Sequence, residues 1–141
     1  LIAQLPEFNW IKKAKLSVDR VREAAMVDDA QQSKLLLAEN LGKLAELQCI
    51  YREYDDAKGS YLEIIDILLE MEKDRPGWHT NELARSYSSL AFVYKELGLK
   101  NEAIESYDDA KSLYKKLAVY DTTFNADIAK CLKAQAELYE S

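Results

Sequence analysis

The 141-residue chain is poor in the two residues that most often interrupt regular structure, with only four glycines and two prolines. A β-sandwich or barrel needs a turn about every eight to twelve residues, and those turns rely on Gly, Pro and Asn. The composition therefore disfavours an all-β fold. Hydrophobic residues make up 48% of the chain and charged residues 31%, a mixture typical of a folded protein. We expect a helical protein with a buried core.

Residues that build metal and redox sites are also scarce. The two cysteines, Cys49 and Cys131, lie 82 residues apart, which fits neither a metal-binding spacing nor a dense disulfide framework. We predict two free thiols inside helices. The single histidine, His79, follows Gly77 and Trp78 at an expected turn, where a capping or surface role is the simplest interpretation.

Catalytic motifs are missing as well. The sequence contains no Gly-rich phosphate loop, no EF-hand spacing and no His-Glu-x-x-His pattern. Its acidic pairs, at 28–29, 55–56 and 108–109, are adjacent in sequence. Neighbouring residues on a helix do not face each other, so such pairs do not converge on a substrate. We predict that the protein is not an enzyme and that it has no metal and no cofactor.

The net charge of −6 disfavours a general surface for nucleic acid or for an anionic membrane. The lysine clusters at 12–15 and 111–116 fit solvated helix faces. No stretch approaches the roughly 18 apolar residues that a membrane span needs, and the start lacks the layout of a signal peptide. We expect a cytoplasmic protein, and because the sequence begins at Leu1 we expect a piece of a longer chain.

The segment 83–117 recurs at a nearly fixed offset. Moved back by 46 residues, the matching pairs are Leu90 with Leu44, Ala91 with Ala45, Ala103 with Ala57 and Tyr107 with Tyr61. Moved forward by 45 residues, they are Ala84 with Ala129, Tyr87 with Leu132, Ala91 with Ala136 and Tyr94 with Tyr139. Agreement of small with small and large with large residues indicates internal repeats.

Each repeat contains two helical stripes. Positions 87, 90, 91 and 94 have the spacing i, i+3, i+4, i+7 of one helix face. Ala103, Tyr107 and Ala110 form a second stripe after Gly98, a residue that can adopt the left-handed conformation that ends a helix. Small residues let two helix backbones approach closely, and large side chains fill the space beside them. The pattern predicts a helical hairpin.

This hairpin resembles the tetratricopeptide repeat. The resemblance lies in the order Tyr87, Leu90, Ala91, Tyr94, Gly98, Ala103, Tyr107 and Ala110, with Lys115 at the place of the family's terminal proline. The family's usual period is about 34 residues, so the chain is more similar to long-repeat members such as kinesin light chains, whose repeats also open with a stretch like 79–84. In the first repeat Gln48 and Arg52 replace the usual Tyr and Gly, which predicts a weaker turn there.

The resemblance implies an all-α fold, a right-handed superhelix of stacked antiparallel hairpins (an α-solenoid) with about six helices. We predict these helices at 6–27, 30–52, 54–73, 80–97, 101–119 and from 124 to the end, with Pro76-Gly77 as the clearest break, Thr80 or Asn81 as a helix cap and Asp121 in a capping cluster. We expect a single domain over 1–141. It consists of a partial repeat or capping helix (1–29), repeat one (30–76), repeat two (77–121) and a half-repeat or capping helix (122–141).

The repeat register also predicts which residues are buried. Ala45, Ala91 and Ala136 are expected in the core. Five of the nine tyrosines occupy core positions of the repeat, namely Tyr61, Tyr87, Tyr94, Tyr107 and Tyr139. The other four, at 51, 54, 114 and 120, are less constrained and are expected at a surface rim.

In the resembling family, the first helix of each hairpin lines a concave groove that holds a partner. The positions transferred by register are Glu39, Lys43, Glu46, Ile50, Arg85, Ser88, Ser89, Phe92, Lys130, Lys133 and Glu137. Phe92 lies outside the Tyr87 stripe, so it is either buried against the next hairpin or exposed as a peptide anchor. Gly42, Glu46 and Ser89 stand where chaperone-binding members carry a carboxylate clamp, which disfavours chaperone tails as the ligand.

The resemblance therefore implies a non-catalytic protein–protein interaction scaffold that binds a partner peptide or helix in a concave groove. The alternative is an assembly or oligomerisation segment of a larger repeat array, motivated by the half-repeat expected at each end. In that case the partners are further repeats or a second copy of the chain.

Overall fold

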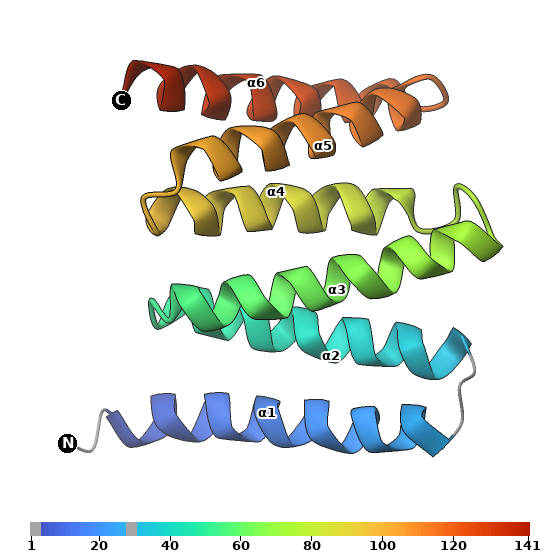
Figure 1. Cartoon of the computed structure of the whole chain (residues 1–141), viewed down its shortest axis with the longest axis vertical. Coiled ribbons are helices and arrows are strands. Elements are labelled where there is room, and N and C mark those ends of the chain that lie inside the picture. The colour runs from blue at the N-terminus through green and yellow to red at the C-terminus, as the bar shows by residue number, and fades with distance from the viewer. Residues whose placement is uncertain (1–3, 28–30) are drawn as a thin grey trace. The chain divides into compact units, whose positions relative to one another are not determined.

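The computed structural model describes residues 4–27 and 31–141, and these form six α-helices and no strand (Figure 1). The helices are α1 (Gln4–Val27), α2 (Gln31–Ile50), α3 (Tyr54–Asp74), α4 (Thr80–Glu96), α5 (Lys100–Ala118) and α6 (Asn125–Glu140), with a 3-10 turn, η1 (Thr122–Phe124), before α6. The six predicted helices are confirmed, and their bounds agree to within two residues. Asp28 and Asp29, one of the acidic pairs, lie outside the described residues.

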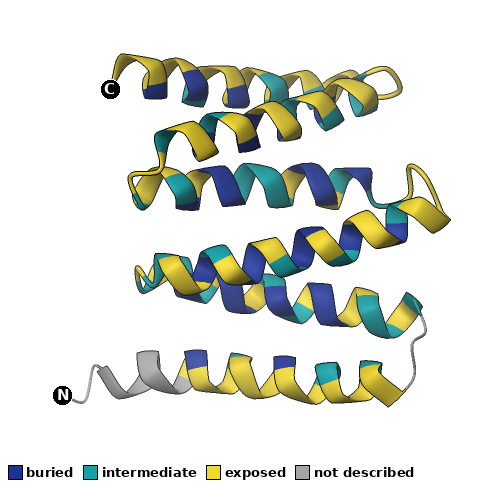
Figure 2. Ribbon diagram, viewed as in Figure 1, coloured by how far each residue is buried: buried dark blue, intermediate teal, exposed yellow. Residues whose placement is uncertain are grey.

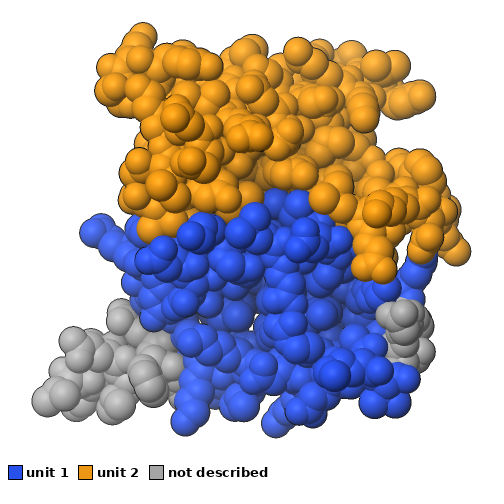
Figure 3. Space-filling view, in the orientation of Figure 1, with its two compact units in different colours: residues 1–67 blue, residues 68–141 orange. Residues whose placement is uncertain are grey.

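The chain divides into two compact units, residues 1–67 and 68–141 (Figure 3). In the first unit, α1 packs against α2. Its core combines Ile11 and Val18 of α1 with apolar residues of the next two helices, namely Leu37, Ala38, Leu41, Leu44, Ala45, Ala57, Tyr61, Ile64 and Ile65. Arg22 on α1 also donates to both carboxylate oxygens of Glu63 on α3, with Nη2 3.1 Å from Oε1.

In the second unit, α5 packs against α4 on one side and against α6 on the other. The shared core consists of Ala84, Ala91, Ala103, Tyr107, Ala110, Tyr114, Cys131 and Leu138, with Tyr87 and Tyr94 packed against it. Small residues of α4 thus meet small residues and tyrosines of α5, as the hairpin pattern predicts. Buried and exposed residues alternate with the helical period along α4 and α5 (Figure 2).

One part of the predicted core is wrong. In α6, Ala129 and Ala136 are exposed, and Leu132 and Tyr139 are 50% and 69% exposed. The buried side of this helix is instead formed by Cys131, Gln135 and Leu138. The prediction failed because it transferred the α4 face that packs on α5, whereas α6 turns a different side toward α5.

The prediction for Tyr114 is also wrong, but here the residue is more buried than expected. It was expected at a surface rim, but it is buried and stacks on Phe124 with ring centroids 6.1 Å apart. The register did not include Phe124, which η1 brings over α5. Tyr61 and Tyr107 are buried as predicted.

The turn between α3 and α4 occurs at the predicted break, where Gly77 has a positive φ of 90°. Neither Thr80 nor Asn81 caps α4, contrary to prediction. Glu72 of α3 instead holds the turn that leads into α4, because its carboxylate accepts from the backbone N–H groups of Gly77 (3.0 Å) and His79 (2.6 Å), which precede the helix. The Thr80 hydroxyl also donates to this carboxylate, at 3.3 Å. The capping cluster at 121–123 is predicted to start the sixth helix, but Asp121 caps η1 instead, accepting from Thr123 N–H at 3.0 Å, and Phe124, the residue before α6, makes no side-chain cap hydrogen bond.

Candidate protein-binding surfaces

Three helices carry the residues that the register assigns to a partner. On α2, Glu39, Lys43, Glu46 and Ile50 are all exposed, and Ile50 is 67% exposed. Their spacing of four, three and four residues places them along one side of the helix. The buried residues of α2, such as Leu41 and Ala45, lie on another side. We call these four residues the α2 stripe.

The α4 stripe consists of Arg85, Ser88, Ser89 and Phe92. Arg85 is exposed, the two serines are half-buried, and Phe92 is 42% exposed. Of the two alternatives for Phe92, full burial is excluded. Part of the Phe92 ring is therefore accessible from outside.

The α6 stripe consists of Lys130, Lys133 and Glu137, which are all exposed. Lys130 and Glu137 are the register equivalents of Arg85 and Phe92, since the offset between α4 and α6 is 45 residues. The α6 stripe therefore lies on the same side of its helix as the α4 stripe does on α4.

The second unit holds the α4 and α6 stripes on one frame, because both helices pack on α5. Tyr114 of α5 is influenced by charged side chains of both α4 and α6. Its pKa is raised to about 12, chiefly by burial and further by the carboxylate of Asp127 on α6, while the guanidinium of Arg85 on α4 acts in the opposite direction. The charges on the two stripes are Arg85, Lys130 and Lys133 against Glu137, so the residues of the two stripes together are basic within an acidic chain. The α2 stripe belongs to the first unit.

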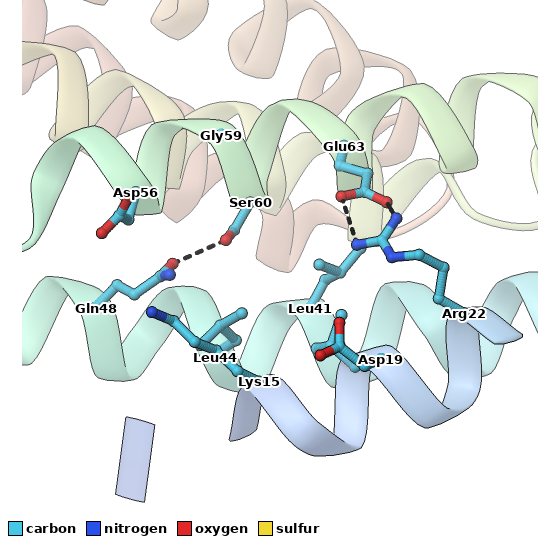
Figure 4. A pocket seen from close by; sticks show the side chains of 11 residues that line it. Lys15, Asp19, Arg22, Leu41, Leu44, Gln48, Asp56, Gly59, Ser60 and Glu63 are labelled. Carbon is cyan, nitrogen blue, oxygen red and sulfur yellow. Dashed lines mark hydrogen bonds and ion pairs between the residues drawn. The ribbon is translucent and has the colours of Figure 1, made fainter. Parts of the chain in front are cut away.

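The structure also contains a pocket that the sequence did not predict. It lies within the first unit, between α1, α2 and α3, and has a volume of about 360 Å³ (Figure 4). Its lining residues are Lys15, Val18, Asp19, Arg22, Leu41, Leu44, Gln48, Asp56, Gly59, Ser60 and Glu63. None of the eleven predicted partner-binding residues is among them. The repeat register gave no signal for this pocket because it assigned α1 only weakly.

Much of the polar lining is already paired. Ser60 Oγ donates to Gln48 Oε1 at 2.8 Å, and Arg22 is paired with Glu63. Around these pairs Lys15 stands with Asp19 and Asp56, so positive and negative groups alternate along the walls (Figure 4). The two cations of the lining, Lys15 and Arg22, stand against the three carboxylates of Asp19, Asp56 and Glu63, so the lining has one negative charge in excess.

The chain has two thiol side chains, the type that most readily acts as a nucleophile or a metal ligand. Both cysteines are free thiols, as predicted, with Cys131 buried and Cys49 half-buried. Burial raises the pKa of each thiol, which keeps it protonated and unreactive at neutral pH. Among residues 10–27 and 31–141, no group of three His, Cys, Asp or Glu side chains could hold a metal ion. No helix within the described residues is long and apolar enough to span a membrane.

No protein-family model matches the sequence, and no curated protein matches it. Among solved structures, the chain is similar to the crystal structure of BtubC (BKLC) from P. vanneervenii, with 22% sequence identity and a TM-score of 0.62. The match covers 95% of this chain and 53% of that chain, so the chain spans about half the length of BtubC. BtubC is a bacterial kinesin light chain of the tetratricopeptide type. This likeness shows the fold, which is all-α and tetratricopeptide-like, with helices packed sequentially as adjacent pairs.

Proposed function

We propose, from this tetratricopeptide-like fold, that the chain is a non-catalytic protein–protein interaction scaffold. It binds a peptide or short helix of a partner protein along the exposed stripes of its first-of-pair helices. One observation carries the proposal. Two register positions are shared by all three stripes, 39/85/130 and 46/92/137, and the side chain is exposed at all six residues. A side of a helix that stays open in three successive copies is available to a partner.

The chemistry of the α4 and α6 stripes indicates what kind of segment they suit. Arg85, Lys130 and Lys133 favour a segment with acidic side chains, since they are spread over two helices that share one frame. Phe92 offers an aromatic anchor at which an apolar side chain of the partner can be desolvated. The α2 stripe has the opposite balance, with two glutamates, one lysine and the exposed Ile50. The partner segment is thus expected to combine acidic and apolar residues.

A random-sequence peptide library displayed on phage tests this proposal. Peptides selected on the wild-type chain should be rich in Asp and Glu and should contain an aromatic or aliphatic residue. The double substitution Arg85→Ala/Phe92→Ala should weaken the binding of those peptides at least about tenfold, because few interface residues carry most of the affinity. Because Phe92 is only 42% exposed, the variant should lose some stability, so binding is compared at a temperature at which circular dichroism shows that both proteins are folded.

The matched control is Lys116→Ala/Tyr120→Ala, which also removes one cation and one exposed aromatic ring but from outside the stripes. This variant should bind the selected peptides as the wild type does. Equal loss in both variants, or no loss in the first, contradicts the proposal.

A further inference from the structure

The pocket of the first unit is formed by one face from each of three helices. On every helix its lining residues recur at helical spacing, at 15, 18, 19 and 22 on α1, 41, 44 and 48 on α2, and 56, 59, 60 and 63 on α3. Val18, Leu41 and Leu44 are buried and form an apolar floor, whereas the charged side chains of the lining are exposed or half-buried. The volume of about 360 Å³ lies within the range of about 300–1,000 Å³ that is usual for small-molecule sites.

Three charged groups of the lining have no direct partner. The guanidinium of Arg22 is paired with the Glu63 carboxylate. By contrast, Lys15, Asp19 and Asp56 form no hydrogen bond or ion pair within residues 10–27 and 31–141. Asp19 acts on Arg22 through its charge alone. The pocket therefore offers two carboxylates and one ammonium group to a ligand.

A buried amide adds a fourth polar group. Gln48 lines the pocket although its side chain is only 3% exposed. Its Oε1 accepts from Ser60 Oγ at 2.8 Å, and its Nε2 donates to no residue of the described part of the chain (Figure 4). A buried donor without an acceptor is costly, so a ligand oxygen that accepts from Nε2 gains affinity.

These four groups lie toward two ends of the pocket (Figure 4). Asp56, Gln48 and the ammonium group of Lys15 lie toward one end, which we call the mixed end. Asp19 lies toward the other, which we call the acidic end. The mixed end thus combines an anion, a cation and an amide donor, whereas the acidic end has an unpaired carboxylate.

A ligand that complements this arrangement has a cation for each end and one carboxylate. At the mixed end an α-ammonium group meets Asp56, while the neighbouring α-carboxylate meets Lys15 and accepts from Gln48. At the acidic end a side-chain cation meets Asp19. A guanidinium group suits a carboxylate best, because two of its N–H groups donate in parallel. Its methylene stem would lie on the apolar floor.

We propose that this pocket binds a free basic amino acid, with arginine as the ligand that fits it best. Arginine has a net charge of one positive unit, which neutralises the single negative charge that the lining has in excess. None of the eleven residues of the α2, α4 and α6 stripes lines the pocket, so this site is separate from the proposed peptide-binding surfaces.

NMR titration of the isotope-labelled chain with arginine tests the proposal. At low ionic strength arginine should shift the backbone signals of Gly59 and Ser60 and the side-chain amide signal of Gln48, saturably and with a Kd of about 1 mM or lower. Agmatine lacks the carboxylate, citrulline the side-chain cation and Nα-acetylarginine the α-ammonium group. Each analogue should bind about fivefold more weakly, the effect of one partly exposed ion pair.

Two substitutions assign the ligand's charges to their partners. Lys15→Met should weaken arginine binding about fivefold, while agmatine, which has no carboxylate, should bind at least as tightly as before. Asp19→Asn should weaken arginine binding to a similar extent and leave citrulline binding unchanged. The matched control is Asp66→Asn, the same change at an exposed carboxylate of α3 outside the lining, and it should bind arginine as the wild type does. All three positions are exposed, so the fold should be retained, which circular dichroism checks.

Several results would overturn the proposal. One is a wild type in which arginine causes no saturable shift at Gln48, Gly59 and Ser60. Another is equal binding of arginine and any of the three analogues. A loss in Asp66→Asn as large as in Asp19→Asn, or variants that bind arginine normally, would do the same. The phage-display experiment is unaffected by each of these results, because it depends on other residues.

Discussion

Arg52 ends α2 in the same left-handed backbone conformation in which Gly98 ends α4, with φ values of 59° and 78°. The hydrogen bonds agree as well. Arg52 N–H donates to Cys49 O at 3.1 Å and Glu53 N–H to Gln48 O at 2.7 Å, while Gly98 N–H donates to Lys95 O at 3.0 Å and Leu99 N–H to Tyr94 O at 2.8 Å. Both hairpins therefore turn in the same way, although only one has the glycine that favours this conformation.

Arg52→Gly should stabilise the protein. A side chain in the left-handed region costs about 1–2 kcal/mol, and the greater freedom of glycine in the unfolded chain offsets part of the gain. We expect the free energy of unfolding to rise by about 0.5–1 kcal/mol in urea denaturation. Gly98→Ala is the opposite control and should lower it by about 1 kcal/mol. Loss of stability in Arg52→Gly would mean that the arginine side chain contributes more than the strain costs.

Equivalent alanines in α4 and α6 should respond differently to the same substitution. Ala91 is fully buried between α4 and α5, so Ala91→Leu overpacks the hairpin and should cost about 1–3 kcal/mol. Ala136 is exposed, so Ala136→Leu should change stability by less than about 0.5 kcal/mol. Both are measured by urea denaturation. Similar costs at the two positions would show that Ala136 is packed against other residues, contrary to its exposure.

Gln48 and Ser60 form a buried polar pair where the repeat usually has a tyrosine. Gln48 is only 3% exposed, and its Oε1 accepts from Ser60 Oγ. Ser60→Ala removes this donor and should cost about 1–3 kcal/mol, because a buried acceptor is left unsatisfied. Gln48→Leu/Ser60→Ala replaces both partners and should recover most of that loss. Additive effects in this double-mutant cycle would show that the two residues do not interact.

The hydrogen bond between Gln135 and Asp108 should be visible in a titration. Gln135 Nε2 donates to Asp108 Oδ1 at 2.7 Å, and this bond, aided by Lys111, lowers the pKa of Asp108 below its ordinary value. A lowered folded-state pKa stabilises the protein above the unfolded pKa, and that contribution is lost as pH falls through the folded pKa. In Gln135→Leu, the pKa of Asp108 measured by NMR should rise toward its ordinary value.

Asp121 serves as the internal reference for this titration. Its pKa is also lowered, but by hydrogen bonds from Thr123. Gln135→Leu should leave the pKa of Asp121 unchanged. If the pKa of Asp108 stays low in the variant, Lys111 rather than Gln135 controls that carboxylate.

Most of the secondary structure could be predicted because its signals are local. Tyr87, Leu90, Ala91 and Tyr94 are spaced by the period of a helix, so they fall on one face over successive turns. That period follows from the helical backbone alone and needs no contact with another helix. Gly98 and the Pro76-Gly77 pair end helices through their own backbone preferences. The exposure of the eleven partner-binding residues followed from the same periodicity, since a helix that packs on its neighbours leaves one side open.

Contacts between residues far apart in the sequence could not be predicted, for a physical reason. The α4 and α6 patterns are alike in kind, yet Ala91 is buried and Ala136 is exposed, because burial depends on the neighbour that a helix face meets and not on the pattern itself. In the same way the Glu72 carboxylate binds the turn before α4 although neither predicted cap of that helix forms, Ser60 supplies a partner for Gln48, and three helices line an open pocket. Helix boundaries and the faces of each helix are thus determined by the short-range spacing of residues in the sequence. Which face is covered, and which polar group is paired, depends on how the helices pack against one another.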